Sequence, residues 1–138
     1  MPVSLEIVSP EKLLVSQSVD MVVIPGAEGD IGVLQDHSPM ITLLRGGEVL
    51  LYDGERVSAR YFVTGGFAEI TEERVTVLAD TAEPSTMLDR AMGERQLTEA
   101  MRELAEAEKA GQVDRLVPLM EKVQVAQAVV DVASAANA

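Results

Sequence analysis

The sequence predicts a β-sandwich over residues 1–84, followed by an antiparallel two-helix hairpin over residues 85–138. Apolar and polar residues alternate up to about Ala79, which is typical of strands with one buried face. After Asp80 the apolar residues recur every three or four positions, which is typical of amphipathic helices. The strand-like runs are short and mostly bounded by glycine or proline, as in sandwiches and barrels.

The alternation is strictest in three runs, Val3–Ile7, Val57–Val63 and Val75–Ala79. The pair Asp53-Gly54 lies between two runs and predicts a tight hairpin turn, because both residues tolerate positive φ. Two glycine pairs between runs predict turns or bulges, namely Gly46-Gly47 and Gly65-Gly66. The other short strand runs are Met21–Ile24, Ile31–Leu34, Val49–Tyr52 and Phe67–Ile70.

The first helix is predicted to start after Pro84, with Thr86 as its N-cap. Asp89 follows Thr86 by three residues, which resembles a capping box. Gly111 is a plausible left-handed C-terminal stop. The predicted apolar row of this helix is Leu97, Met101, Leu104 and Ala107.

The second helix is predicted to be capped by Asp114, with a start shifted further along because Pro118 suits a first turn. The short connection predicts antiparallel packing of the two helices. From Val123 to Val132 the helix is apolar around most of its circumference, so it needs another surface, either the sandwich or a different subunit. Its predicted apolar row is Leu116, Met120, Val123 and Val130.

The formal net charge of −12 argues against nucleic acid as a partner, because phosphate binding depends on lysine and arginine. It also disfavours an anionic lipid surface. The chain has no run of about 18 apolar residues, and its start lacks the pattern of a signal peptide. We therefore expect any membrane association to come through another protein. Residues 1–83 carry 14 acidic and 5 basic side chains, so a basic partner is their natural complement.

The residues offer little for catalysis. His37 is the only histidine and there is no cysteine, so neither a paired-histidine nor a thiolate metal site is expected. The glycine-bearing segment Pro25–Gly32 lacks the lysine and hydroxyl residue of a phosphate loop. Its acids lack the spacing of an EF-hand calcium loop. No catalytic, metal or cofactor site is predicted, and the acids fit either a solvated turn or an acidic loop that faces a partner.

Two long segments carry a family resemblance. The run Val23–Leu34, followed by His37–Thr42, closely resembles the signature loop of the epsilon subunit of F-type ATP synthases. Phe62–Ile70, followed by Val75–Ala82, resembles the second signature of that family. Both lie in the predicted β part, and the helical tail has the family's length and order. The resemblance spans nearly the whole chain.

This resemblance implies a ten-stranded sandwich that clamps the foot of the gamma stalk and sits on the c-ring, as a non-catalytic rotor subunit. It implies that Glu28, Gly29 and Asp30 face the c-ring loop and that His37 lies near the gamma stalk. With no transit peptide in the sequence, we expect a peripheral location on the cytoplasmic face of a bacterial inner membrane, with thylakoid attachment as the alternative. The rival interpretation is an acidic β-sandwich adaptor that binds some other basic protein.

The helical part departs from the family in two respects. Some members bind ATP through an aspartate and an arginine three positions apart, whereas Asp89 and Arg90 are adjacent here and point about 100° apart on a helix. We expect no tight ATP binding. In some members a basic last helix blocks the alpha and beta subunits of the catalytic head. Here Arg115 and Lys122 are outnumbered by Asp114, Glu121 and Asp131, so we expect weak inhibition and a hairpin mostly folded against the sandwich.

Overall fold

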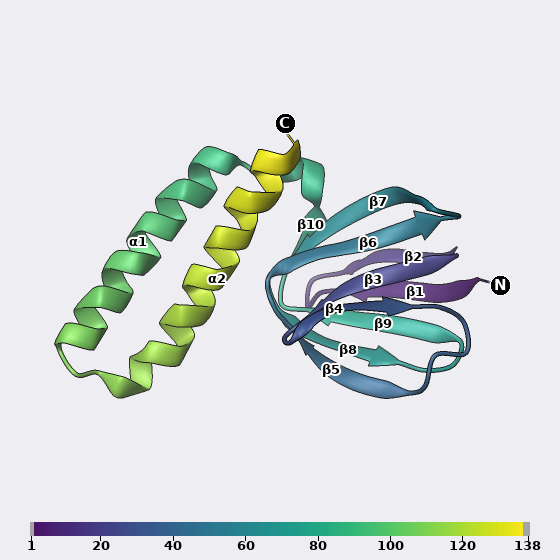
Figure 1. Ribbon diagram of the computed structural model, residues 1–138, viewed down its shortest axis with the longest axis horizontal. Helices are drawn as coiled ribbons and strands as arrows, with labels where there is room; N and C mark the ends of the chain where they lie inside the picture. Colours follow the sequence, from purple (N-terminus) through teal and green to yellow (C-terminus); the bar gives the residue numbers. More distant parts are fainter. Residues whose placement is uncertain (1, 137–138) are drawn as a thin grey trace. The chain divides into compact units, whose positions relative to one another are not determined.

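The computed structural model describes residues 2–136 and divides into two compact units, Met1–Ser85 and Thr86–Ala138. The first unit contains the strands and the second the two long helices (Figure 1). Within the described residues, no helix is long and apolar enough to cross a membrane. The strands are β1 (Val3–Val8), β2 (Leu13–Val19), β3 (Met21–Gly26), β4 (Gly29–Val33), β5 (Met40–Leu44), β6 (Gly47–Asp53), β7 (Arg56–Val63), β8 (Gly66–Ile70), β9 (Arg74–Ala79) and β10 (Ala82–Pro84).

The ten strands form one hydrogen-bonded sheet in the order β10-β7-β6-β3-β5-β8-β9-β1-β2, with β4 paired to β3. Neighbouring strands are antiparallel, except that β1 runs parallel to β9. The inward side chains of nine strands meet in a single core, so the sheet is folded over into a sandwich. The ten-stranded sandwich expected from the sequence is confirmed.

Alternating burial along the strands fixes which face points inward. On β1, Val3, Leu5 and Ile7 have no exposed surface, whereas Ser4 is exposed. A register slip by one residue would move all three apolar side chains to the solvent face, so the sequence pattern specifies the pairing. The rest of the core comes from Val15, Val19, Val22, Ile24, Val33, Leu44, Val49, Leu51, Val63, Ala68, Ile70, Val75, Val77 and Ala79.

The β6–β7 turn and the Gly65-Gly66 pair require glycine for different reasons. Asp53 is the last residue of β6, so the turn consists of Gly54 and Glu55 and only Gly54 has positive φ, at 65°. That pattern is typical of a type II′ hairpin turn. Gly66 has φ of 119°, and a β-carbon there would lie 2.1 Å from the carbonyl oxygen of Leu78. No residue with a side chain fits that position.

Helix α1 (Arg90–Lys109) follows a 3-10 turn, η1 (Ser85–Met87). The prediction of Thr86 as N-cap is wrong, because Thr86 lies in the 3-10 turn and Asp89 has the extended cap geometry. The Asp89 side chain accepts a hydrogen bond from the Met92 amide at 3.2 Å. The helix ends at Ala110 as its C-cap, and Gly111 follows with φ of 69°, as expected.

Helix α2 (Val113–Ala136) starts before Asp114, so the expectation of a delayed start is wrong. Pro118 lies in its second turn, where the missing amide hydrogen leaves one carbonyl of the first turn without its helical bond. Asp114 lies in the first turn, where its negative charge complements the positive end of the helix dipole.

Buried residues recur every seven positions along the contact between the two helices. A β-carbon on Gly93 would lie 2.8 Å from a Val129 methyl group, and Lys122 lies 3.7 Å from Glu103, so the pairing is antiparallel. The predicted apolar rows are therefore partly wrong: Met101 and Met120 are exposed, whereas Ala107 is buried and Val130 lies beside Gly93. The buried positions are Gly93, Ala100 and Ala107 on α1, and Leu119, Ala126 and Ala133 on α2.

Candidate functional site

The β3–β4 hairpin presents the acidic segment singled out in the sequence. Gly26 pairs with Gly29, which leaves Ala27 and Glu28 as an exposed two-residue turn. Gly26 is needed there, since a β-carbon would lie 2.6 Å from the Gly29 carbonyl oxygen. Gly29 has φ of 149°, a backbone conformation that residues with a side chain rarely adopt. The hairpin therefore depends on both glycines to carry Glu28 at its tip.

Backbone hydrogen bonds hold this turn beside the end of β5. The Ala27 amide donates to the Leu43 carbonyl oxygen at 2.8 Å, and the Arg45 amide donates to the Pro25 carbonyl oxygen at 3.0 Å. Gly26 also pairs with Leu44 in the sheet. The turn is consequently an extension of the sheet rather than a free loop.

The two predicted acids of this segment have different environments. The Arg45 guanidinium donates to an Asp30 carboxylate oxygen at 2.6 Å and to the Gly26 carbonyl oxygen at 2.5 Å. Glu28 has no ion pair among the described residues. Sequence reasoning missed Arg45, although it is the only lysine or arginine between Lys12 and Arg56.

A shallow groove of about 470 Å³ lies between the turn and β5, lined by residues 26–31 and 40–43. On its β5 side, Ile41 and Leu43 are 70% and 69% exposed. Leu43 pairs with Phe67 of β8, which is 42% exposed, so their side chains share one face. These three residues form what we call the apolar patch. Exposed apolar groups gathered beside a charged turn are typical of a protein-binding surface.

His37 lies at the other end of β5 from Glu28. Strand β4 leads away from the turn, and residues 34–39 return the chain to Met40 at the start of β5. The strand extends about 3.4 Å per residue, so its two ends are roughly 14 Å apart. The structure therefore brings Glu28, Gly29 and Asp30 together and places His37 apart from them. Nδ1 of His37 lies 2.7 Å from the Ser38 carbonyl oxygen, so that nitrogen carries the proton in this contact.

The comparisons with known proteins agree on one family. The model of the ATP synthase delta/epsilon chain β-sandwich domain matches residues 2–85. The ATP synthase epsilon chain of Granulibacter bethesdensis is 52% identical over 130 residues, which cover 94% of this chain and 96% of that relative. The chain belongs to the ATP synthase epsilon chain family. The corresponding chain of Gluconacetobacter diazotrophicus is 46% identical over 133 residues, which cover 96% of this chain and 94% of the relative.

The fold of this epsilon chain family member also occurs in solved structures. A chain in the cryo-EM structure of the Euglena gracilis mitochondrial ATP synthase, which contains OSCP, F1 and the c-ring, superposes with a TM-score of 0.78. The alignment covers 99% of this chain and 82% of that chain, at 20% identity. This likeness shows the fold, and the family model and the two relatives confirm the family resemblance inferred from the two signature segments.

The aspartate and arginine at the start of α1 both bond within the helix. The Asp89 carboxylate caps the helix, and Nε of Arg90 donates to the Glu94 carboxylate at 3.0 Å. Any ligand that used these two side chains would have to displace both interactions. The absence of an ATP site stays a prediction.

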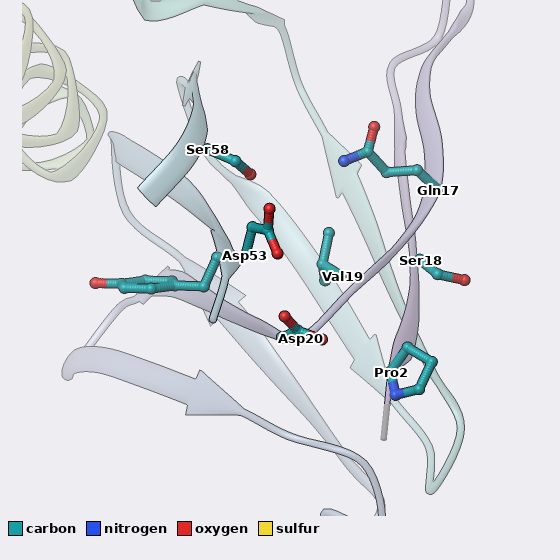
Figure 2. A pocket seen from close by; sticks show the side chains of 8 residues that line it. Pro2, Gln17, Ser18, Val19, Asp20, Asp53 and Ser58 are labelled. Carbon is teal, nitrogen blue, oxygen red and sulfur yellow. The ribbon is translucent and has the colours of Figure 1, made fainter. Parts of the chain in front are cut away.

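A second pocket, of about 230 Å³, is bounded by β2, β6 and β7 (Figure 2). Its wall includes the acids Asp20 and Asp53. The Asp20 carboxylate accepts a hydrogen bond from the Gly54 amide at 2.6 Å, so it anchors the β6–β7 turn. Among residues 2–136, no group of three or more histidine, cysteine, aspartate or glutamate side chains is arranged to hold a metal ion.

Proposed function

We propose that the chain is a non-catalytic central-stalk subunit of a proton-translocating F-type ATP synthase, which links the gamma stalk to the c-ring. Its membership of the epsilon chain family supports this role. The single observation that carries it is that Ile41 and Leu43 of the exposed apolar patch line the same groove as the acidic turn. Residues 1–84 are the rotor clamp in this proposal, and residues 85–138 are a regulatory arm with a weak effect on the alpha and beta subunits.

The apolar patch is the proposed contact for the gamma stalk. Ile41 and Leu43 point outward from β5 instead of joining the core, so covering them removes aliphatic surface from water. Full burial of such a side chain contributes about 1.5–3 kcal/mol. Covering both side chains therefore contributes about 3–6 kcal/mol to binding, against which the entropy cost of association is set. His37, at the far end of β5, extends this contact.

The β3–β4 turn is the proposed contact for the c-ring, with Glu28, Gly29 and Asp30 facing a basic side chain of a c-ring loop. The exposure of Glu28 and its lack of an ion pair among the described residues support that assignment. Exposed ion pairs contribute about 0–1 kcal/mol, so the turn sets orientation more than overall affinity. The subunit would thus be held at the cytoplasmic face of a bacterial inner membrane through the complex.

Affinity purification from native membranes tests the role. A tagged full-length chain is expected to recover gamma and c subunits. The Leu43→Asp variant is expected to lose about tenfold or more in gamma recovery, because a carboxylate replaces a side chain that must be buried. Leu13→Asp is the matched control, since Leu13 is a 56% exposed leucine on β2. Recovery of neither gamma nor c would overturn the rotor role and favour an adaptor for another basic protein.

Reconstitution of the ATP synthase with variant chains tests the proposed contact between the β3–β4 turn and the c-ring. We expect a Glu28→Lys, Asp30→Lys double variant to assemble a rotor with weakened coupling between proton flow and ATP synthesis. Glu55→Lys, on the exposed β6–β7 turn, is the control for the reversal of a single charge. A fully coupled enzyme containing the double variant would contradict the c-ring assignment.

A further inference from the structure

We propose that Arg45 is a positioning residue for the c-ring contact. Its guanidinium holds the β3–β4 turn and neutralises Asp30, so that Glu28 is the carboxylate presented to a basic partner. This inference rests on the proposed function, because it divides the roles of residues within the same acidic turn. It changes the expectation that Glu28 and Asp30 act alike.

The geometry of Arg45 ties together both strands of the hairpin. Its side chain bonds to the carbonyl oxygen of Gly26 on β3 and to the carboxylate of Asp30 on β4. Its own amide bonds to the Pro25 carbonyl oxygen, which fixes the backbone from which the side chain projects. A planar guanidinium can make two such directed bonds at once, whereas a lysine ammonium acts as a point charge.

Asp30 and Glu28 differ in whether their carboxylate is already paired with a cation. The Asp30 carboxylate is already paired with a cation at 2.6 Å, so a basic side chain of the partner has to compete with or share that contact. Glu28 has no such cation among the described residues, and its side chain lies at the exposed tip. A partner cation therefore gains more by pairing with Glu28. The three side chains together leave a net charge of −1 on the turn, which Glu28 supplies.

The two hydrogen bonds of the Arg45 side chain also order the β3–β4 turn before a partner binds. Ala27 and Glu28 are exposed, and an exposed turn without such bonds loses backbone freedom when a partner fixes it. Arg45 restricts the turn before binding, because its guanidinium bonds to both the Gly26 carbonyl oxygen and the Asp30 carboxylate. Less backbone entropy is then lost when the partner binds. Pre-ordering of this kind strengthens binding without a direct contact to the partner.

The test is the affinity of full-length variants for detergent-solubilised c-ring purified from the same enzyme. Glu28→Gln is expected to weaken binding about fivefold, the upper range for an exposed ion pair. Arg45→Ala is expected to weaken it by a similar factor and to speed hydrogen exchange of the Ala27 amide. Asp30→Asn is expected to change affinity by less than about twofold, because its amide oxygen still accepts from Arg45. Arg56→Ala, which removes an equal charge from an 80% exposed arginine on β7, is the control.

The double variant Glu28→Gln, Arg45→Ala separates positioning from general stability. If Arg45 acts through Glu28, the double variant binds no more weakly than Glu28→Gln alone, whereas independent effects multiply. A large effect of Asp30→Asn with none of Arg45→Ala overturns the inference and leaves the proposed function standing. Normal binding of Glu28→Gln overturns the inference, and normal binding of both Glu28→Gln and Asp30→Asn overturns the proposed c-ring contact as well.

Discussion

Gly93 of α1 packs against Val129 of α2 so closely that a β-carbon on the glycine would lie 2.8 Å from a valine methyl group. The same added atom would lie 3.3 Å from Val130. Both valines are β-branched, and their χ1 angles are stiff in a helix, so neither side chain can turn away. The helices can therefore approach this closely only because residue 93 is a glycine, which has no β-carbon.

We expect Gly93→Ala to destabilise the helical hairpin, although alanine is the better helix former. The propensity gain is about 1 kcal/mol, and overpacking against a rigid contact costs about 1–3 kcal/mol. The net loss is expected to be up to about 2 kcal/mol, measured by urea unfolding of the full chain and by amide exchange in α1. Gln96→Ala, at an exposed position of the same helix, is the control. A hairpin stabilised by Gly93→Ala would show that the helices separate without cost.

Gly66→Ala is expected to be far more damaging than an ordinary glycine substitution. Its β-carbon would meet the Leu78 carbonyl oxygen at 2.1 Å, and that oxygen belongs to the backbone of β9. We expect a loss of about 3 kcal/mol or more in the free energy of unfolding, or failure to fold. Gly54→Ala is the matched comparison, because Gly54 has φ of 65° but nothing within 4 Å. That variant should lose only about 1–2 kcal/mol, and equal losses would contradict the steric explanation.

Asp89→Ala is expected to destabilise the start of α1 by about 1 kcal/mol, because it removes the bond to the Met92 amide. Asp89→Asn should be nearly neutral, since asparagine caps equally well. Thr86→Ala should have little effect, because Thr86 lies before the cap in the 3-10 turn. Urea unfolding followed by circular dichroism measures all three. A larger loss of stability for Thr86→Ala than for Asp89→Ala would contradict Asp89 as the N-cap and support the predicted capping box at Thr86.

The pKa of Glu99 is expected to be lower than its ordinary value of 4.5, because Arg102 donates hydrogen bonds to its carboxylate. Arg102 also donates to Glu106 at 2.6 Å. Since the folded-state pKa is the lower one, the carboxylate stabilises the helix above pH 4.5, and this contribution is lost as the pH falls through the folded value.

Carboxyl chemical shifts recorded by NMR as a function of pH test that expectation. Arg102→Gln should return the Glu99 midpoint toward its ordinary value, whereas Arg95→Gln, a control on the same helix, should leave it lowered. A Glu99 midpoint that does not respond to Arg102→Gln would show that the carboxylate is held by another group.

Predictions from periodicity succeeded where burial follows a strict alternation. Val3, Leu5 and Ile7 are fully buried as expected, because a strand has only two faces. Periodicity was less successful on α2, where Met120 was expected in the contact row but is 49% exposed. Large apolar residues surround much of that helix, so hydrophobicity alone cannot select the contact face. Its buried positions are Leu119, Ala126 and Ala133, so the contact face follows the seven-residue spacing of the helix pair and not the size of the apolar side chains.

The site was predictable in part. Glu28, Gly29 and Asp30 were singled out from the family resemblance. Arg45 was missed because it lies 15 residues from Asp30 in the chain, and only strand pairing brings the two together. The exposure of Ile41 and Leu43 was also not predictable, since apolar residues on a short strand look the same whether they face the core or a partner.

The sequence by itself determined the family, the division into a strand part and a helical part, and the alternating core positions of strands such as β1. These depend on local backbone preferences and on the period of apolar residues, which each segment carries within itself. Only the tertiary structure decided that Asp30 is paired with Arg45, that Glu28 is not, and that Gly93 and Ala100 lie in the helix contact. Those outcomes depend on distances between segments far apart in the chain, and hydrogen bonds and close packing form only when folding brings such segments within a few ångströms.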